Sequence, residues 1–133
     1  MSQENTEIVR RMMKAFNERD VPTLELTFSE DVVMRLIGGF AGLMGTEFRG
    51  QEAAGTWLGD WVQTIGGHAE IERLHDVDDR VLAIATMVTA GTLSGTPATL
   101  RYGQVYSFRD GCISRLDTYY VVDEALKAVG LEE

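Results

Sequence analysis

The sequence has few of the residues on which covalent or metal-based chemistry depends. It contains one cysteine, Cys112, which excludes a disulfide framework and the paired cysteines of a zinc knuckle. Its two histidines, His68 and His75, are not spaced as a pair of metal ligands, and neither an HExxH nor a GxSxG motif occurs. No histidine lies near Cys112 in sequence to activate its thiol as a nucleophile. We therefore expect neither a metal nor a cofactor.

Positive charge is also scarce. Lysine and arginine number 12 against 21 aspartates and glutamates, so the formal net charge is −9 at pH 7. A field of that sign repels phosphate backbones and anionic lipids, so we expect neither nucleic acid nor a membrane as a partner. No apolar run approaches the roughly 20 residues of a membrane span. The polar first residues do not resemble a signal peptide, and we expect a cytoplasmic protein.

What the sequence does contain is the composition of an ordinary globular domain. It has 133 residues, of which 44% are hydrophobic and 25% are charged. This length is enough to bury a core, and no linker, repeat or low-complexity segment divides the chain. We expect a single domain over residues 1–133.

The first half of the chain carries most of the helical patterns. Apolar residues recur every three or four positions over about residues 6–19, which predicts an amphipathic helix with Ser2 or Asn5 as its N-cap. Asp20 can cap a short second helix that has Pro22 in its first turn. Two more helices are expected, at Gly50–Ile65 and Asp123–Val129.

Strand patterns dominate the second half. Three segments are rich in β-branched and apolar residues: Val32–Ile37, Arg80–Leu93 and the hairpin Thr99–Val121. Glu70–His75 can form an edge strand. Since Arg80–Leu93 is apolar on both faces, we expect helices on one side of it and a second subunit on the other. Helices first and a strand meander afterwards indicate an α+β protein, with helices on one face of a curved antiparallel sheet.

The hairpin predicts a pocket. One face of it is aromatic and apolar with two polar groups, and comprises Leu100, Tyr102, Gln104, Tyr106, Phe108, Leu116, Thr118, Tyr120 and Val122. We interpret this face as a pocket wall, on which the glutamine, the threonine and the tyrosine hydroxyls orient a ligand oxygen. The other candidates for ligand contact are apolar side chains from the rest of the chain, namely Phe16, Met34, Phe40, Trp61 and Met87.

Two of the remaining features lie around residues 35–45. Phe40 belongs to a glycine-rich, apolar stretch without lysine or phosphate-binding spacing, which we interpret as a lid over the cavity. Arg35 interrupts an apolar strand. It either faces outward on the sheet, which we favour, or serves as a cation at the pocket rim for a carboxylate or enolate.

The direction of Asp117, the only carboxylate on the two strands of the hairpin, depends on the turn. A two-residue turn at Asp110-Gly111 pairs Gln104 with Asp117 and directs that carboxylate into the pocket. A three-residue turn that begins at Arg109 pairs Gln104 with Leu116, and Asp117 then points away. We prefer the second register, because it keeps Leu116 and Tyr120 on the same face as Tyr102 and Tyr106. A buried Asp117 would also need a partner to offset its desolvation.

Four stretches resemble the SnoaL-like members of the nuclear transport factor 2-like superfamily, and they occur in the expected order: SQENTEIVRRMMKAFNERD, FSEDVV, the FRG of residues 48–50, and YSFRDGCISRLDTYY. The resemblance covers nearly the whole chain. It implies a cone-shaped curved sheet packed by three helices around an internal cavity, and usually a homodimer, here through the outer sheet face. Relatives include polyketide cyclases, ketosteroid isomerases and limonene epoxide hydrolases.

The same resemblance puts unusual residues at the relatives' catalytic positions. The general base of the isomerases falls near Leu36, and their helix tyrosine falls near Met12. Their protonated aspartate, an oxyanion donor, falls at Gln104, whose amide can also donate. The last-strand carboxylate of cyclases and epoxide hydrolases falls at Thr118, unless a bulge brings in Asp117.

Three functions therefore stay open. A protein that binds a small apolar oxygenated molecule needs only the cavity and a few orienting groups. A cofactor-independent isomerase, cyclase or hydrolase acting on a polyketide- or steroid-like substrate needs Asp117 inside, or Arg35 and Gln104 polarising a carbonyl. A structural dimer follows if aromatic side chains fill the cone.

Overall fold

The structure, a computed structural model, describes residues 2–37, 47–64, 67–89 and 98–131. Its centre is a six-stranded sheet with the strand order β2-β1-β6-β5-β4-β3. The strands are β1 (Phe28–Ile37), β2 (Glu47–Arg49), β3 (His68–Val77), β4 (Arg80–Val88), β5 (Thr99–Arg109) and β6 (Cys112–Tyr119). Neighbouring strands are antiparallel except β1 and β6, which run parallel. This pair departs from the expected antiparallel sheet, because only strands joined by a tight hairpin must run antiparallel.

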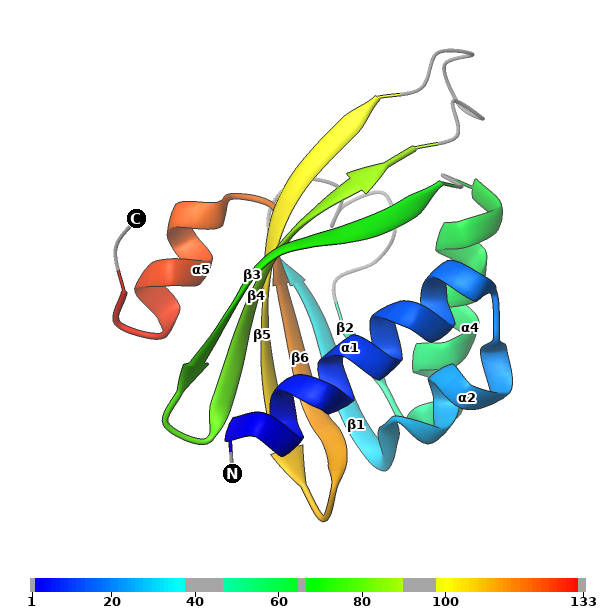
Figure 1. Cartoon of the computed structure of the whole chain (residues 1–133). Helices are drawn as coiled ribbons and strands as arrows, with labels where there is room; N and C mark the ends of the chain where they lie inside the picture. The colour runs from blue at the N-terminus through cyan, green and yellow to red at the C-terminus, as the bar shows by residue number, and fades with distance from the viewer. Residues whose placement is uncertain (1, 38–46, 65–66, 90–97, 132–133) are drawn as a thin grey trace.

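Three helices from the first half of the chain lie on one side of the curved sheet, as expected, and are α1 (Ser2–Glu18), α2 (Val21–Leu26) and α4 (Gln51–Thr64). A short last helix, α5 (Val122–Ala128), lies on the opposite side (Figure 1). We call the side that faces α1 the inner face of the sheet and the side that faces α5 its outer face. The fold class is therefore α+β, as the sequence predicts.

The helix α1 packs on β3 and β4 through its apolar stripe. Five residues of that stripe are buried, namely Ile8, Val9, Met12, Met13 and Phe16. The helix begins at Ser2, so Ser2 and Asn5 lie within it and the predicted N-cap is wrong. At its other end Asn17 bonds to the backbone of Ala69 in β3, since Nδ2 donates to the carbonyl over 2.9 Å and Oδ1 accepts from the N–H over 2.8 Å.

The predicted cap of α2 is confirmed. The Asp20 carboxylate accepts from the N–H of Thr23 over 3.3 Å, and Pro22 lies in the first turn. The chain then enters β1 earlier than expected, because the strand begins at Phe28 and not at Val32. The pairing of β1 with β6 is irregular over that stretch, up to Val33.

Two apolar clusters pack on the two faces of the sheet. The larger cluster joins the inner face to α1 and α2. The smaller one packs α5 on the outer face and contains Leu82, Ile84, Val105, Val122, Ala125, Leu126 and Val129. The outward side chains of β4 are thus covered by a helix of the same chain, and the two-sided apolarity of this strand requires no second subunit. Val122, predicted on the pocket face, belongs to this outer cluster.

The turn between β5 and β6 has two residues. Asp110 has a φ of 53° and Gly111 a φ of 78°, and Arg109 pairs with Cys112. Left-handed conformations at both central positions define a type I′ turn. The three-residue turn that we preferred is therefore wrong.

A β-bulge in β6 then reverses the consequence of that turn. Phe108 pairs with Ile113, but the preceding Ser107 pairs with Arg115, which leaves Ser114 as an extra residue. An extra residue exchanges the two faces for everything that follows it. Gln104 therefore pairs with Thr118, and Val105 pairs with Asp117. The predicted outward direction of Asp117 holds, but the predicted pairing of Gln104 with Leu116 does not.

Candidate ligand-binding site

A pocket, which we call the cavity, lies between α1 and the inner face of the sheet and has a volume of about 40 Å³. One water requires about 10–15 Å³, whereas pockets for drug-sized ligands have roughly 300–1,000 Å³. The described lining residues are Met12, Met13, Phe16, Met87, Leu100, Tyr102, Gln104, Leu116, Thr118 and Tyr120. None of these residues carries a charge at neutral pH, so the wall that we describe is apolar with a few neutral hydrogen-bonding groups.

The polar groups of the wall form a short chain of hydrogen bonds. The hydroxyl of Tyr106 donates to Oε1 of Gln104 over 2.5 Å, and Nε2 of Gln104 donates to Oγ1 of Thr118 over 3.2 Å. Tyr106 is fully buried, while Gln104 and Thr118 line the cavity. The cross-strand pairing of Gln104 with Thr118 brings these two side chains together, so the bulge at Ser114 is what creates the contact.

The three inner tyrosines are held in their protonated form. Burial raises the pKa of Tyr102, and the nearby Tyr120 adds to this rise. Burial likewise raises the pKa of Tyr120, and it raises the pKa of Tyr106 far above the ordinary value, with a further contribution from Tyr102. These phenols therefore act as hydrogen-bonding groups at neutral pH, not as bases.

Most of the predicted pocket residues meet at this cavity. The described lining includes six of the candidates, which are Phe16, Met87, Tyr102, Gln104, Thr118 and Tyr120. Tyr106 and Met34 are not among the described lining residues. Tyr106 is buried next to Gln104, and Met34 is buried in the core at 1% exposure. Phe40 lies outside the described residues, as does the proposed lid, and the side chain of Trp61 on α4 is not described.

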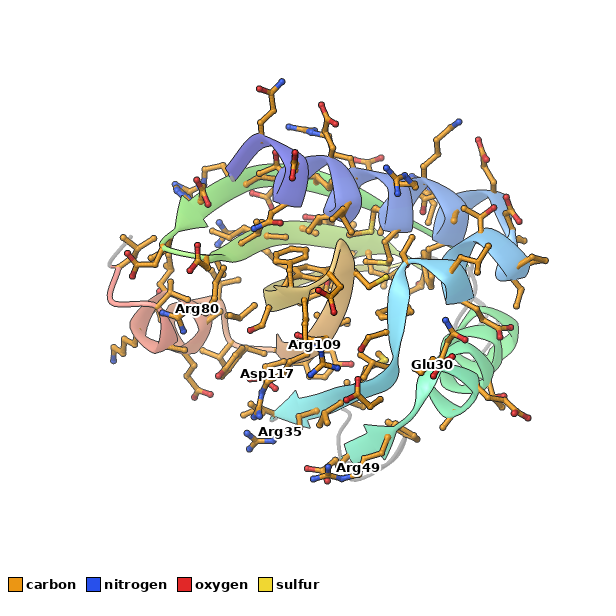
Figure 2. All side chains as sticks on the ribbon, turned by 90° about the horizontal axis from the view of Figure 1, so that it is seen from below. Glu30, Arg35, Arg49, Arg80, Arg109 and Asp117 are labelled. Carbon is orange, nitrogen blue, oxygen red and sulfur yellow. The ribbon has the colours of Figure 1, made fainter. Side chains whose placement is uncertain are left out.

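The two charged candidates lie elsewhere. Arg35 of β1 pairs with Asp117 of β6, and both side chains lie on the outer face of the sheet, away from α1 (Figure 2). The carboxylate of Asp117 accepts from Nε of Arg115 over 3.2 Å, and its side chain is 14% exposed. Alternation along the strand places Asp117 on the face opposite Thr118, so the structure brings neither Arg35 nor Asp117 to the described cavity wall.

Two lining residues, Met12 and Met13, were not predicted at the pocket. They lie on the apolar stripe of α1, whereas Leu100 and Leu116 belong to the hairpin face that we interpreted as the pocket wall. The periodicity of α1 could have identified the methionines, because the same stripe contains the candidate Phe16. Methionine is unbranched and polarisable, so these side chains can adapt to ligands of different shape.

The described residues offer no sign of two other kinds of site. Within them, no three histidine, cysteine, aspartate or glutamate side chains gather closely enough to hold a metal ion. In the same residues, no helix combines the length and the apolar character that crossing a bilayer requires.

Comparison with known proteins identifies the class to which this fold and cavity belong. Residues 9–116 match the SnoaL-like domain family, and the chain therefore belongs to that family. No curated protein sequence matches the chain.

Solved structures with the same fold include Bal32a from a soil-derived mobile gene cassette, at 25% identity and a TM-score of 0.78, covering 88% of both chains. A protein of Catenulispora acidiphila with a ketosteroid isomerase-like fold, in complex with trimethylamine, is 21% identical, with a TM-score of 0.75 over 94% of this chain and 93% of that one. An LEH-like epoxide hydrolase of M. tuberculosis is 20% identical, with a TM-score of 0.75 over 96% of this chain and 90% of that one.

Proposed function

We propose that this protein binds a small, largely apolar molecule that carries an oxygen, in the cavity between α1 and the inner face of the sheet. The observation that carries the proposal is the composition of the described lining, in which Gln104, Thr118, Tyr102 and Tyr120 bring polar groups to an otherwise apolar wall. Such a wall provides area for burial and a few groups for orientation, as small-molecule sites do.

The ligand is small. A cavity of about 40 Å³ admits a compact molecule but leaves no room for a steroid or a polyketide without movement of the wall. The neighbour from Catenulispora acidiphila holds trimethylamine, which is a ligand of this size class. A structural dimer with a filled cavity is less well supported, because open volume remains among the described side chains.

The methionines provide a direct test. We would label their methyl groups with ¹³C and titrate the protein with acetone, which is compact and has one oxygen. The signals of Met12, Met13 and Met87 should shift in a saturable way, because these residues line the cavity. The signal of Met34, which is buried outside the cavity, should stay in place.

A matched pair of variants separates the cavity from the surface. Leu100→Trp places a large ring in the cavity and should abolish the shifts. Leu26→Trp introduces the same ring at a residue that is 73% exposed, and the shifts should remain. Absence of any saturable shift in the unmodified protein would refute the proposal.

An enzyme of the isomerase, cyclase or hydrolase type is the second candidate. It is favoured by buried donors that could polarise a carbonyl, and a structural neighbour is an LEH-like epoxide hydrolase. In such an enzyme Gln104 and the tyrosines would act as neutral donors, and Asp117→Asn should leave turnover of any substrate unchanged. Loss of turnover in that variant would instead assign Asp117 a role.

We also propose a homodimer through the part of the outer face beside α5. Val33 and Ile37 are only partly buried there, on the edge half of the sheet that contains β1 and β2. Sedimentation should give twice the mass of the chain, and Val33→Glu should give a monomer because it introduces charge into the interface. A monomer in the unmodified protein would reject this assembly.

A further inference from the structure

We propose that Tyr106 is a positioning residue that sets the polarity of the binding site. It holds the amide of Gln104 so that Thr118 presents a hydrogen-bond donor to the cavity, and the ligand's polar atom is therefore an acceptor such as a carbonyl oxygen. This inference rests on the proposed function, because it specifies which small molecules the same cavity accepts.

Tyr106 sets the direction of the hydrogen bonds that link it to Gln104 and Thr118. Its side chain has 0% exposure, so its hydroxyl hydrogen must find an acceptor within the protein or remain unsatisfied. Oε1 of Gln104 lies 2.5 Å away and is that acceptor. With the amide turned over, the NH₂ group would face the phenol oxygen, and the phenol hydrogen would lose this partner. Leaving a fully buried donor unpaired is costly, so the observed orientation is favoured.

The orientation of the amide then determines the role of Thr118. When Oε1 faces Tyr106, Nε2 faces the neighbouring strand and donates to Oγ1 of Thr118 over 3.2 Å. A hydroxyl that accepts in this way keeps its own hydrogen for another acceptor. Among the described residues, that hydrogen meets no protein acceptor. Because Thr118 lines the cavity, the donor is available to a ligand.

The charge of the wall points to the same ligand class. The described lining contains no carboxylate to balance an ammonium group, whereas an ammonium ion buried without a partner is strongly disfavoured. A neutral molecule with one acceptor oxygen satisfies the donor of Thr118 and loses little solvation. The structure thus assigns a preference for ketones, esters or similar carbonyl compounds over amines and hydrocarbons of the same shape.

Three probes of the same size test this preference, namely acetone, isobutene and trimethylamine. Isobutene replaces the carbonyl oxygen of acetone by a methylene group, and trimethylamine is a cation at neutral pH. Affinities are read from the methyl signals of Met12, Met13 and Met87. We expect the unmodified protein to bind acetone about tenfold more tightly than isobutene, as the loss of one buried hydrogen bond predicts, and to bind trimethylamine weakest.

Substitutions test each hydrogen bond in the series from Tyr106 through Gln104 to Thr118. Tyr106→Phe removes only the phenol oxygen, frees the amide to turn, and should reduce the ratio of acetone to isobutene affinity about three- to tenfold. Thr118→Val should abolish the preference altogether, whereas Thr118→Ser keeps the hydroxyl and should retain it. Tyr119→Phe, which removes a phenol oxygen from the outer face, should leave the ratio unchanged.

The outcomes distinguish the two proposals. If none of the probes binds, the proposed function fails, and this inference fails with it. If acetone and isobutene bind equally to the unmodified protein, or if Tyr106→Phe folds and keeps the full preference, the cavity binds ligands but its polarity is not set by Tyr106. Should Tyr106→Phe fail to fold, the comparison of Thr118→Val with Thr118→Ser decides, and equal preferences in those two variants would overturn the inference.

Discussion

Ala125 of α5 lies against the backbone of Gly103 in β5. A β-carbon built on Gly103 would stand only 2.6 Å from Cβ of Ala125, so the helix rests directly on the strand at this point. Gly103 pairs with Tyr119 on one side and with Ile84 on the other. The glycine thus allows α5 to lie directly on the outer face of the sheet, where the helix covers the outward side chains of β4.

Gly103→Ala should destabilise the fold by about 1–3 kcal/mol, because the added methyl group forces α5 away from the sheet. Urea unfolding measures the change. Gly59→Ala is the matched control, since a β-carbon there meets no described atom within 4 Å, and removal of a glycine from a helix should increase stability by up to about 1 kcal/mol. Adding Ala125→Gly to Gly103→Ala should show favourable coupling in a double-mutant cycle. Additive effects would mean that the two residues do not touch.

Asn17→Leu should cost about 2–4 kcal/mol, because it leaves both the N–H and the carbonyl of the buried Ala69 without their partner. Exchange of the Ala69 amide hydrogen should become faster, since that hydrogen bond closes the edge of β3. Lys14→Ala on the same helix should change stability by less than about 0.5 kcal/mol, as its pair with Glu18 at 3.8 Å is exposed. Equal losses in the two variants would contradict the structure.

Leu116→Ala should enlarge the cavity and destabilise the protein by about 2–5 kcal/mol, because Leu116 is fully buried and lines the wall. The variant should also bind cyclohexanone, which is larger than acetone, more tightly than the unmodified protein does. Leu26→Ala, at an exposed position, should alter neither property. A loss of stability without any gain in cyclohexanone affinity would indicate that the cavity collapses on truncation.

Stability should fall steeply above about pH 10. The pKa values of Tyr102, Tyr106 and Tyr120 are raised in the folded state, so the unfolded chain loses these protons first. The stabilisation is complete below the unfolded pKa of about 10 and decreases as the pH rises above it. Three such groups give a slope that approaches about 4 kcal/mol per pH unit.

Urea unfolding between pH 9 and 11, together with tyrosinate absorbance, measures this effect. Tyr106→Phe should reduce the slope by about one third, because one of three groups is removed. Ionisation of all the tyrosines near pH 10 in a chain that stays folded would show that none of them is buried as described.

The sequence predicted which residues line the site better than it predicted how those residues pair across the strands. The aromatic face of Tyr102, Gln104 and Tyr120 follows from the two-residue period of a strand, and the stripe of α1 follows from helical periodicity. The class of fold followed from the order of these patterns. The exact partners of each residue did not, since Gln104 faces Thr118 instead of Leu116.

The sequence by itself therefore determined local features. It determined which side chains share a face of each helix or strand, that Asp20 caps a helix, and that the pocket face of the hairpin is uncharged and mostly apolar. The tertiary structure decided which of those faces lie toward α1 and which lie toward α5. One inserted residue, Ser114, changes the side on which Asp117 lies, and α5 supplies from the end of the chain the cover that a second subunit was expected to provide. Both depend on contacts between residues distant in sequence, which periodicity does not report, because it records the direction of a side chain relative to its neighbours and not what it meets.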